Sequence, residues 1–334
     1  MVGAVVVSPD GVVVSQGYHE RAGDRHAEIV AIEAAGSRAR GATLYCTLEP
    51  CAHQGRTGPC AARIVDAGIT RVVASVEDPN PLVNGRGFAY LRAQGVLVDV
   101  GLGAAESMAL NRPFFTLIRE ERPFVILKAA TSADGYMAES RTSRTFLTSA
   151  ATNRHAQLTR AMVDAVAVGS GTVLADDPLL TARGVFRERP LTRVVFDRRL
   201  RTPPAARLLS TLEAGPVIII TTAGAPAAAR RALEARGAEI LTTDGTVRGA
   251  LTLLARRAIG CLLLEGGAAL HAAAWDEGVV DFVRLYVSPA TLGGGDDRVP
   301  LLPNQPFWAA TLADRRVETL GPDVLIEGYV HGPR

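Results

Sequence analysis

Three of the chain's four cysteines lie in one stretch, CTLEPCAHQGRTGPC, which spans residues 46–60. Cys51 and Cys60 each follow a proline, and the polar residues His53 and Arg56 lie between them. Clustered cysteines form disulfides in oxidising compartments and bind metals or do catalysis in reducing ones. The stretch therefore predicts a disulfide loop, a structural metal loop or half of a catalytic metal site.

The motif His26-Ala27-Glu28 supplies what a catalytic zinc site would still need. His26 with Cys51 and Cys60 gives three protein ligands, and a catalytic zinc keeps its fourth position for water. Zinc lowers the pKa of that water toward about 7. Glu28, which is not a ligand in this scheme, is expected to take the water proton and pass protons to the substrate. H-A-E followed by P-C and a later cysteine is the signature of zinc-dependent deaminases.

A closed structural zinc site is the alternative, with Cys46 or His53 as the fourth ligand. The cysteine spacing narrows the deaminase class, because deaminases of nucleosides and nucleic acids typically carry P-C-x-x-C. Here eight residues separate Cys51 from Cys60. The longer loop is expected to bring His53 and Arg56 beside the metal, where they would hold a polar ring or a phosphate. A solvated turn is the alternative for these two residues.

Length and composition predict two α/β domains. A chain of 334 residues is long for one domain, and 48% hydrophobic residues are enough for two cores. The formal net charge is +2 and no long basic run is present, so no nucleic-acid partner is expected. The sequence shows no signal-peptide pattern and no apolar run of about 18 residues. We therefore expect a cytoplasmic protein without a membrane span, which disfavours the disulfide.

Hydrophobic periodicity places the motifs on alternating strands and helices. The first 17 residues predict two strands joined at Pro9-Asp10-Gly11, where Gly11 takes the positive φ of a hairpin turn. Helices are expected at 26–38, 60–67, 104–119, 150–162, 225–235 and 247–257. Strands are expected at 42–47 and 71–75, and then at PFVILKAA, AVAVG, TRVVFD, PVIIITT, CLLLEGG and FVRLYVSP. The charged segment REERP marks a domain boundary near residue 120.

Gly-rich turns after several strands predict a phosphate-binding cofactor site. The stretch VGSGTVLADDP contains G-x-G but lacks the third glycine of a dinucleotide fingerprint. Glu265-Gly266-Gly267 and the glycines at 293–295 supply two more turns. A helix starting near Ala268 would direct its N-terminus at a pyrophosphate. Any one of these clusters is equally explained as a tight turn, and the three together favour a cofactor.

Over nearly its whole length the sequence resembles the bifunctional riboflavin-biosynthesis proteins. This family joins a diaminohydroxyphosphoribosylaminopyrimidine deaminase to a 5-amino-6-(5-phosphoribosylamino)uracil reductase. HAE, TLEPCAHQGRTGPC and DPNPLVNGRG resemble the first half, and LKAATSADGYMA, VGSGTVLADDPLLTAR, LLLEGGAAL and LYVSPATLGGG resemble the second. The resemblance implies a three-layer, cytidine-deaminase-like α/β domain over residues 1–120. It also implies a dihydrofolate-reductase-like α/β domain over residues 121–334.

The resemblance also implies the chemistry of each half. The first would hydrolyse the 2-amino group of 2,5-diamino-6-ribosylamino-4(3H)-pyrimidinone 5′-phosphate, with one zinc on His26, Cys51 and Cys60 and with Glu28 as the proton-shuttling acid. The second would reduce the ribosyl group with NADPH, giving 5-amino-6-ribitylaminouracil 5′-phosphate. The partners would be these small pyrimidine ribosyl phosphates and further copies of the chain, as a homo-oligomer.

Matching the reductase motifs residue by residue gives two sets of predicted contacts. The cofactor contacts implied by the resemblance are Ala130, Thr172, Asp176, Gly267, Ala268, Ala269, Leu270, His271, Ala272 and Ala273. The substrate contacts implied in this half are Lys128, Arg160, Leu180, Arg183 and Glu265. Arginine suits the substrate phosphate because its planar fork donates two hydrogen bonds.

Two features depart from the family pattern. An N-terminal helix and a P-N-P turn precede the first strand in the family, whereas this sequence starts at Met1-Val2-Gly3. Either a start codon lies upstream, or a covering helix and a substrate contact are lost. The second departure is Phe146, where the family usually has tryptophan. An active reductase joined to an impaired deaminase, a nucleoside or nucleic-acid deaminase, and a zinc-stabilised binding module are the alternatives, and the sequence alone leaves NADH open beside NADPH.

Overall fold

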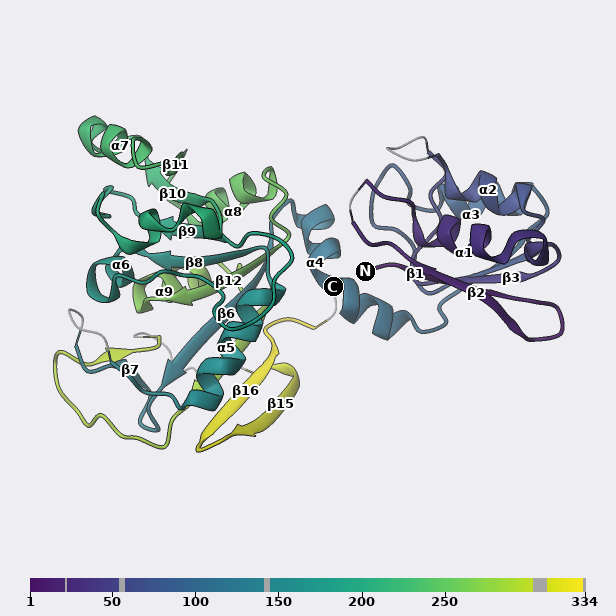
Figure 1. Cartoon of the computed structure of the whole chain (residues 1–334). Helices are drawn as coiled ribbons and strands as arrows, with labels where there is room; N and C mark the ends of the chain where they lie inside the picture. The colour runs from purple at the N-terminus through teal and green to yellow at the C-terminus, as the bar shows by residue number, and fades with distance from the viewer. Residues whose placement is uncertain (22, 54–57, 141–144, 303–310, 333–334) are drawn as a thin grey trace. The chain divides into compact units, whose positions relative to one another are not determined.

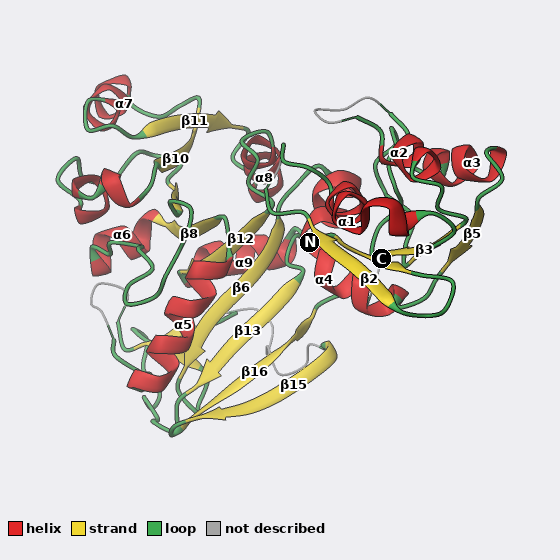
Figure 2. Ribbon diagram, turned by 45° about the vertical axis from the view of Figure 1, so that its right-hand side comes forward, coloured by secondary structure: helices red, strands yellow, loops and turns green. Residues whose placement is uncertain are grey.

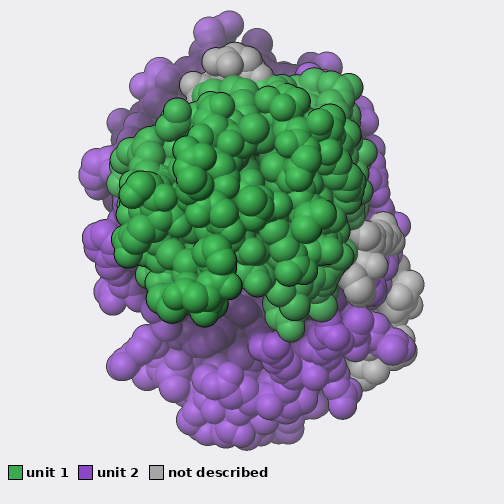
Figure 3. Space-filling view, turned by 90° about the vertical axis from the view of Figure 1, so that its right-hand side faces the viewer, with its two compact units in different colours: residues 1–120, 333 green, residues 121–332, 334 purple. Residues whose placement is uncertain are grey.

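The computed structural model describes residues 1–21, 23–53, 58–140, 145–302 and 311–332. The chain divides into two compact units, Met1–Glu120 and Glu121–Gly332, which Figure 3 colours separately. Among the described residues, no helix has the length and apolar character needed to cross a membrane.

The first unit is built on a five-stranded sheet in the order β2-β1-β3-β4-β5. Its strands are β1 (Gly3–Val7), β2 (Val13–Tyr18), β3 (Thr43–Cys46), β4 (Arg71–Ala74) and β5 (Leu97–Val100). β1 runs antiparallel to β2 and β3, whereas β3, β4 and β5 are parallel. The β1–β2 turn contains Gly11 at a φ of 86°, which confirms the predicted hairpin and its glycine.

Helices cover one face of this sheet. They are α1 (Ala27–Ala35), continued by a short 3₁₀ turn at Gly36–Ala39, α2 (Cys60–Asp66) and α3 (Arg86–Ala93). Alternate strand residues such as Val6, Leu44 and Val72 pack with Ile64 and Leu91 in one buried cluster, because successive strand side chains point to opposite faces. Figure 1 shows α1, α2 and α3 on the same side of the strands. The unit ends with α4 (Ala104–Glu120).

The second unit is built on a nine-stranded sheet in the order β11-β10-β9-β8-β12-β6-β13-β16-β15. Its strands are β6 (Phe124–Thr131), β8 (Ala165–Gly169), β9 (Thr192–Phe196), β10 (Val217–Thr222), β11 (Glu239–Thr243), β12 (Cys261–Gly266), β13 (Phe282–Val287), β15 (Ala313–Leu320) and β16 (Asp323–Tyr329). In this order, the first seven strands, from β11 through β8 and β12 to β13, are mutually parallel. The β15–β16 hairpin adds two antiparallel strands at one edge. β7 (Tyr136–Ala138) and β14 (Val299–Pro300) form a separate small pair. Figure 2 shows the long strands β6, β13, β16 and β15 side by side.

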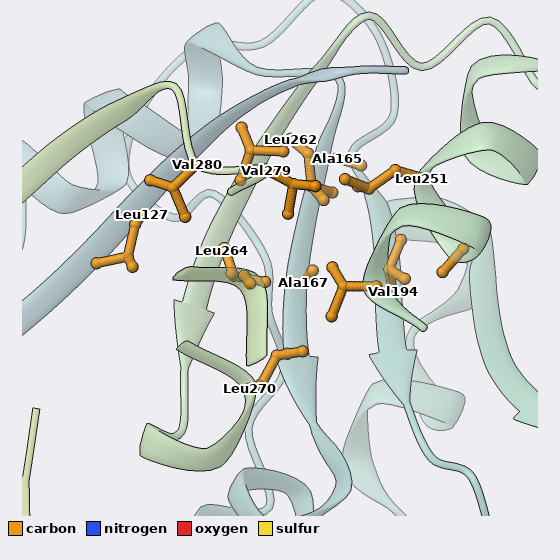
Figure 4. Close-up of a cluster of buried hydrophobic side chains, with 14 of the residues drawn as sticks. Leu127, Ala165, Ala167, Val194, Leu251, Leu262, Leu264, Leu270, Val279 and Val280 are labelled. Carbon is orange, nitrogen blue, oxygen red and sulfur yellow. The ribbon is translucent and has the colours of Figure 1, made fainter. Parts of the chain in front are cut away.

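Helices lie on both faces of the parallel strands, which explains why these strands are continuous apolar runs. They are α5 (Ala150–Met162), α6 (Ser170–Asp176), α7 (Ala227–Glu234), α8 (Val247–Ala255) and α9 (Ala268–Asp276), with 3₁₀ turns at Arg207–Ser210 and Leu212–Ala214. Leu251 of α8 and Leu270 of α9 pack against Ala167, Val194 and Leu264 of the sheet (Figure 4). The opposite face packs in a second cluster that includes residues of α6 and α7. The carboxyl ends of seven parallel strands therefore meet at one edge.

Most predicted elements are confirmed, with differences at their ends. α5 has its predicted bounds, and the predicted helix at 26–38 begins one residue later and finishes as the 3₁₀ turn. The predicted helices at 225–235 and 247–257 are each shorter by a few residues. The sequence analysis missed α6, β7, β11, β14, β15 and β16, and it gave no bounds for α3 and β5.

Candidate active sites

The three predicted zinc ligands come together in the first unit. His26 is the residue just before α1, Cys60 begins α2, and Cys51 lies in the loop after β3. His26 Nδ1 is 3.1 Å from Cys60 Sγ and 3.6 Å from Cys51 Sγ, and the three ligand atoms all lie within 4.8 Å of one another. Zn–N and Zn–S bonds of about 2.0 and 2.3 Å at a tetrahedral angle place N and S about 3.5 Å apart. The donor set therefore fits one zinc ion with a position left for water.

Glu28 is on the first turn of α1 and is 3% exposed. Burial raises the pKa of its carboxyl to about 7. The thiols are also perturbed: a hydrogen bond from Cys60, opposed by burial and aided by His26, lowers the pKa of Cys51 to about 4. The scaffold thus favours a thiolate at Cys51, the form in which cysteine binds a metal.

A cavity opens over these residues and is lined by side chains from several segments. His19, His53, Asp78, Asn80, Asn111 and Phe114 line it together with His26, Glu28 and Cys51. The predicted contact His53 is thus beside the metal ligands, and its buried Nδ1 has no hydrogen-bond partner among the described residues. Arg56, the other loop residue predicted to contact substrate, lies outside the described residues.

Glu49 holds the segment that carries Asp78 and Asn80, a role that the sequence analysis missed. Its buried carboxylate accepts hydrogen bonds from the backbone N–H groups of Asp78, Gly85, Gly87 and Phe88 at 2.9–3.3 Å. Gly87 approaches so closely that a Cβ there would lie 1.9 Å from the carbonyl oxygen of Pro50. The cavity wall is therefore fastened to the residues just before Cys51. No short stretch of the sequence predicts that TLEPC and DPNPLVNGRG lie side by side.

The cysteines can be tested against one another by substitution. Cys51→Ser is expected to lower zinc content from one ion per chain to near zero, because it removes one of three ligands. Cys46 is a buried residue of β3 whose burial raises its thiol pKa well above the usual range, so it is not placed to bind metal as a thiolate. Cys46→Ser should therefore retain zinc. Metal analysis of both variants checks this, and zinc loss in Cys46→Ser as well as in Cys51→Ser would support a closed structural site.

Three charged residues converge at the carboxyl ends of strands in the second unit. Arg160 of α5 donates two hydrogen bonds to Glu265 of β12, both at 2.6 Å, and Nη1 donates to the carbonyl of Thr181 at 2.9 Å. The buried carboxyl would have a raised pKa from burial, but the charge and hydrogen bonds of Arg160 lower it to about 2. Lys128 of β6 is close enough to Glu265 and Arg160 to feel both charges, and burial lowers its pKa.

Most of the predicted substrate contacts are therefore near one another, but Arg160 contacts Glu265 instead of being open to a phosphate. Leu180 is buried just before Thr181, and the backbone N–H of Arg183 donates to Gln157 Oε1 of α5 at 2.8 Å. Arg183 is exposed, so its guanidinium is accessible to a phosphate. The guanidinium of Arg160, in contrast, already forms an ion pair with Glu265. The phosphate contact predicted for Arg160 stays a prediction, and it requires this ion pair to open.

Three of the ten predicted cofactor residues line a cavity in this unit. Ala269, Leu270 and Ala273 of α9 line it, together with Gly169 and Gly171 at the start of α6. Thr172 Oγ1 lies 3.4 Å from the position of a Cβ on Gly267, which joins the two glycine turns. Ala130 is in β6, Ala268 and Ala272 are in α9, and Asp176 ends α6. None of these last four is among the residues that line the cavity, and neither are Thr172, Gly267 and His271.

Two predicted features lie elsewhere. Glycines 293–295 do not line this cavity, because Asp134 accepts hydrogen bonds from the backbone of Leu292 and Gly293 and holds their loop. The side chain of His271 is fully buried, with Nε2 3.2 Å from the carbonyl oxygen of Leu264. Only the backbone of His271 is therefore available to a cofactor in this conformation.

His271 makes the stability of the second unit depend on pH. Burial lowers its pKa to about 4, although the bond to Leu264 and the charge of Glu265 act in the other direction and Lys128 acts in the same one. The unfolded state therefore binds more protons between about pH 6.5 and 4, so stability is present above pH 6.5 and falls as the pH drops through this window. We expect the native protein to lose about 2 kcal/mol more than His271→Gln between pH 6.5 and 4.5. Urea titrations at both pH values measure the free energy of unfolding. An equal loss of this free energy in the native protein and in His271→Gln would contradict the prediction.

Comparison with known proteins covers both units. Residues 123–326 match the family described as RibD C-terminal domain, and residues 1–76 match the cytidine and deoxycytidylate deaminase zinc-binding region. The riboflavin biosynthesis protein RibD of Aquifex aeolicus is 40% identical over 97% of this chain and 90% of its own length. That of Escherichia coli is 36% identical over 97% and 92%.

Solved structures resemble this chain over nearly its whole length. The structure of Acinetobacter baumannii RibD (form 1) has a TM-score of 0.86 and 34% identity, and the alignment covers 98% of this chain and 91% of that one. A diaminohydroxyphosphoribosylaminopyrimidine deaminase/5-amino-6-(5-phosphoribosylamino)uracil reductase from Thermotoga maritima has a TM-score of 0.82 and 32% identity, with coverage of 98% and 91%.

Proposed function

This chain belongs to the RibD family of riboflavin biosynthesis, bifunctional enzymes with a deaminase and a reductase domain, and on that premise we propose the reaction of each unit and the residues that carry it out. Residues 1–120 would remove the 2-amino group of the diaminopyrimidinone ribosyl phosphate. Residues 121–334 would reduce the ribosyl group of the product with NADPH. The substrate assignment is supported by the printed function of the Thermotoga maritima relative.

The observation that carries the deaminase assignment is the clustering of His26, Cys51 and Cys60, beside a cavity that His26, Glu28 and Cys51 line. The three ligand residues would hold zinc, which when bound supplies an activated water. Glu28 lies two residues after His26 with its carboxylate buried beside the ligands, and it would hold the proton taken from the attacking water. It would then deliver protons to the ring nitrogen and to the departing amine. His53, Asp78 and Asn80 would orient the polar ring.

In the reductase unit, NADPH supplies the hydride and the protein supplies orientation. Lys128 and Glu265 would hydrogen-bond the sugar, because their strands place them together at the carboxyl edge of the sheet. Arg183 would hold the substrate phosphate. Arg160 would keep the carboxylate of Glu265 ionised and aimed. The cofactor would lie along the cavity lined by residues 169–171 and by Ala269, Leu270 and Ala273.

We also propose a cytoplasmic homo-oligomer. All four cysteines are free thiols, as a zinc site with cysteine ligands requires, and this suits a reducing compartment. An apolar hollow on the sheet of the first unit, lined by Val5, Tyr45 and Leu102, is the kind of surface that an oligomer covers. Sedimentation equilibrium of the purified chain tests the assembly, and a monomer at micromolar concentration would contradict it.

Both half-reactions should be measured on one purified sample of known zinc content. We expect one zinc per chain, ammonia release from the diaminopyrimidinone ribosyl phosphate, and NADPH oxidation with the deaminated product. NADPH oxidation without ammonia release would favour the alternative of an impaired deaminase. Deamination of cytidine or single-stranded DNA, or the absence of both activities, would contradict the proposed function.

A further inference from the structure

The ammonium group of Lys128, at the proposed sugar site, has one specific contact. Lys128 is on β6, which lies between β12 and β13 in the sheet. On the β12 side, both carboxylate oxygens of Glu265 accept hydrogen bonds from Arg160. Within the described ranges, Lys128 makes no side-chain hydrogen bond and no ion pair. On the β13 side, its Nζ lies 5.6 Å from the centroid of the Tyr286 ring, which is within the range of a cation–π contact.

The ring of Tyr286 is held in place from α5. Tyr286 pairs with Ala130 in the parallel register of β13 and β6, so its side chain is on the same face of the sheet as that of Lys128. The side chain of Tyr286 is fully buried, and its hydroxyl oxygen is 2.8 Å from Nδ1 of His155. The two rings meet edge to face at 71°, with their centroids 5.8 Å apart. This hydrogen bond at the far end of the ring fixes the face that the ring offers to Lys128.

The protonation of this pair leaves the ring neutral. Burial raises the pKa of Tyr286 to about 12, so the hydroxyl keeps its proton at neutral pH. Burial and the charge of Arg284 lower the pKa of His155, so its imidazole is uncharged there. The hydroxyl of Tyr286 therefore donates to Nδ1 of His155. The neutral ring attracts an ammonium to its electron-rich face.

The proposed reduction needs the ammonium of Lys128 at a defined place. In the net reaction, hydride from NADPH forms the C1′–H bond, the C1′–O4′ bond of the ribosyl ring breaks, and the electron pair left on O4′ takes up a proton. An ammonium that is hydrogen-bonded to O4′ stabilises the charge that develops there and can supply this proton, which water then replaces. Lysine carries its charge on a flexible four-carbon stem, so a fixed neighbour is needed to hold it in position.

We infer that Tyr286 is a positioning residue of the reductase unit, whose ring holds the ammonium of Lys128 at the substrate sugar and is itself held by His155. The inference rests on the proposed reductase function and adds two residues that act through Lys128. A purely structural role is the competing explanation, because the bond between Thr152 and Asp323 also fastens α5 to the sheet. In that case, loss of the Tyr286 ring would lower stability and leave turnover unchanged.

Steady-state kinetics of the full chain separate the two roles. NADPH oxidation with the deaminated product is measured for the native chain, Tyr286→Leu and Tyr286→Phe. Leucine keeps an apolar side chain without the ring, and Tyr286→Leu should lower kcat about 10- to 30-fold, the factor expected for one desolvated cation–π contact. The KM for the sugar phosphate should change less than about threefold, because the charge on O4′ develops in the transition state. Tyr286→Phe keeps the ring and should lose less than about fivefold in kcat.

His155 is tested by non-additivity. His155→Ala should lower kcat by about the same factor as Tyr286→Phe, because each removes the same hydrogen bond. The double variant should be no slower than either single variant, since neighbours that act through one contact are not additive. A product of the two single losses in the double variant would contradict the role of His155 as the residue that holds the ring.

Tyr329→Leu is the matched control for Tyr286→Leu. Tyr329 is on β16 of the same sheet, and its ring packs edge to face on Phe124 and Phe282. Removing this ring should lower the urea midpoint of the second unit but leave kcat within about twofold of the native value. Ammonia release by the first unit should be native in every variant.

Chemical labelling gives a second measurement that does not depend on turnover. Only the neutral amine of lysine reacts with acetic anhydride, and a cation–π contact favours the charged form. Lys128 should therefore be acetylated several-fold faster in Tyr286→Leu than in the native chain or in Tyr286→Phe, as followed by peptide mass spectrometry at neutral pH.

Three outcomes would overturn the inference. They are a native kcat in folded Tyr286→Leu, equal losses of kcat in Tyr286→Leu and Tyr286→Phe, and equal losses in Tyr286→Leu and the Tyr329→Leu control. A native chain that oxidises no NADPH with the deaminated product would instead contradict the proposed reductase function. In that case the labelling rates still test the contact between Tyr286 and Lys128, so the two failures are distinguishable.

Discussion

Replacing Glu28 by glutamine should abolish nearly all ammonia release while the protein keeps its zinc and its reductase activity. Glutamine has the size of glutamate and preserves the packing of this buried position, but it cannot accept and return a proton. Positioned proton transfer contributes roughly 10²- to 10⁴-fold to such reactions, so a fall of that size is expected. The deamination rate, zinc content and NADPH oxidation of one preparation provide the measurement.

Glu33→Gln is the matched control for Glu28→Gln. Glu33 is on the same helix, but its side chain is 41% exposed and pairs with Arg25 at the surface. It should leave deamination within about twofold, because exposed ion pairs contribute little. Retained deamination in Glu28→Gln would remove Glu28 from the proton transfer. Zinc loss in that variant would mean that Glu28 supports the metal site instead.

Replacing Asp281 by asparagine should destabilise the second unit by about 3–5 kcal/mol, because it removes the carboxylate that pairs with a buried guanidinium. Asp281 accepts hydrogen bonds from Arg122 Nη1 and Nη2 at 2.7 and 2.8 Å and from the backbone N–H of Val125 at 2.8 Å. Arg122 is 1% exposed, so water cannot replace the lost carboxylate. Both tryptophans of the sequence, Trp275 and Trp308, follow residue 120, so tryptophan fluorescence in urea reports the unfolding of this unit.

The control for Asp281→Asn removes a charge from an exposed pair. Glu239 pairs with Arg257, with side chains 48% and 33% exposed, and Glu239→Gln should cost less than about 1 kcal/mol. The double variant Arg122→Met with Asp281→Leu should recover much of the lost stability, since an apolar pair can replace a buried ion pair. If Asp281→Asn is as stable as Glu239→Gln, the buried pair is not a main stabilising contact of this unit.

Features encoded by neighbours in the chain were predictable. The hairpin at Gly11 needs a residue that tolerates positive φ, and the bounds of α5 follow from its own capping serine and periodicity. The zinc ligands and Glu28 were named because cysteine and histidine in that spacing have a specific chemistry. β15 escaped prediction because it is charged and exposed along most of its length, and it forms only by pairing with β16.

The sequence by itself therefore determined the chemistry of the metal site and the two α/β units, because residue type and local periodicity carry that information. Only the tertiary structure decided which distant groups meet. It pairs the guanidinium of Arg160 with Glu265, which is 105 positions away in the chain. It also places the carboxylate of Glu49 where it accepts hydrogen bonds from backbone N–H groups 29 to 39 positions away. It also places Arg198, Arg199 and Arg201, which follow β9, among the residues that line the cofactor cavity, whereas glycines 293–295 do not line it. Such pairings depend on strand order, and strand order is fixed by packing of the whole sheet rather than by any short stretch of residues.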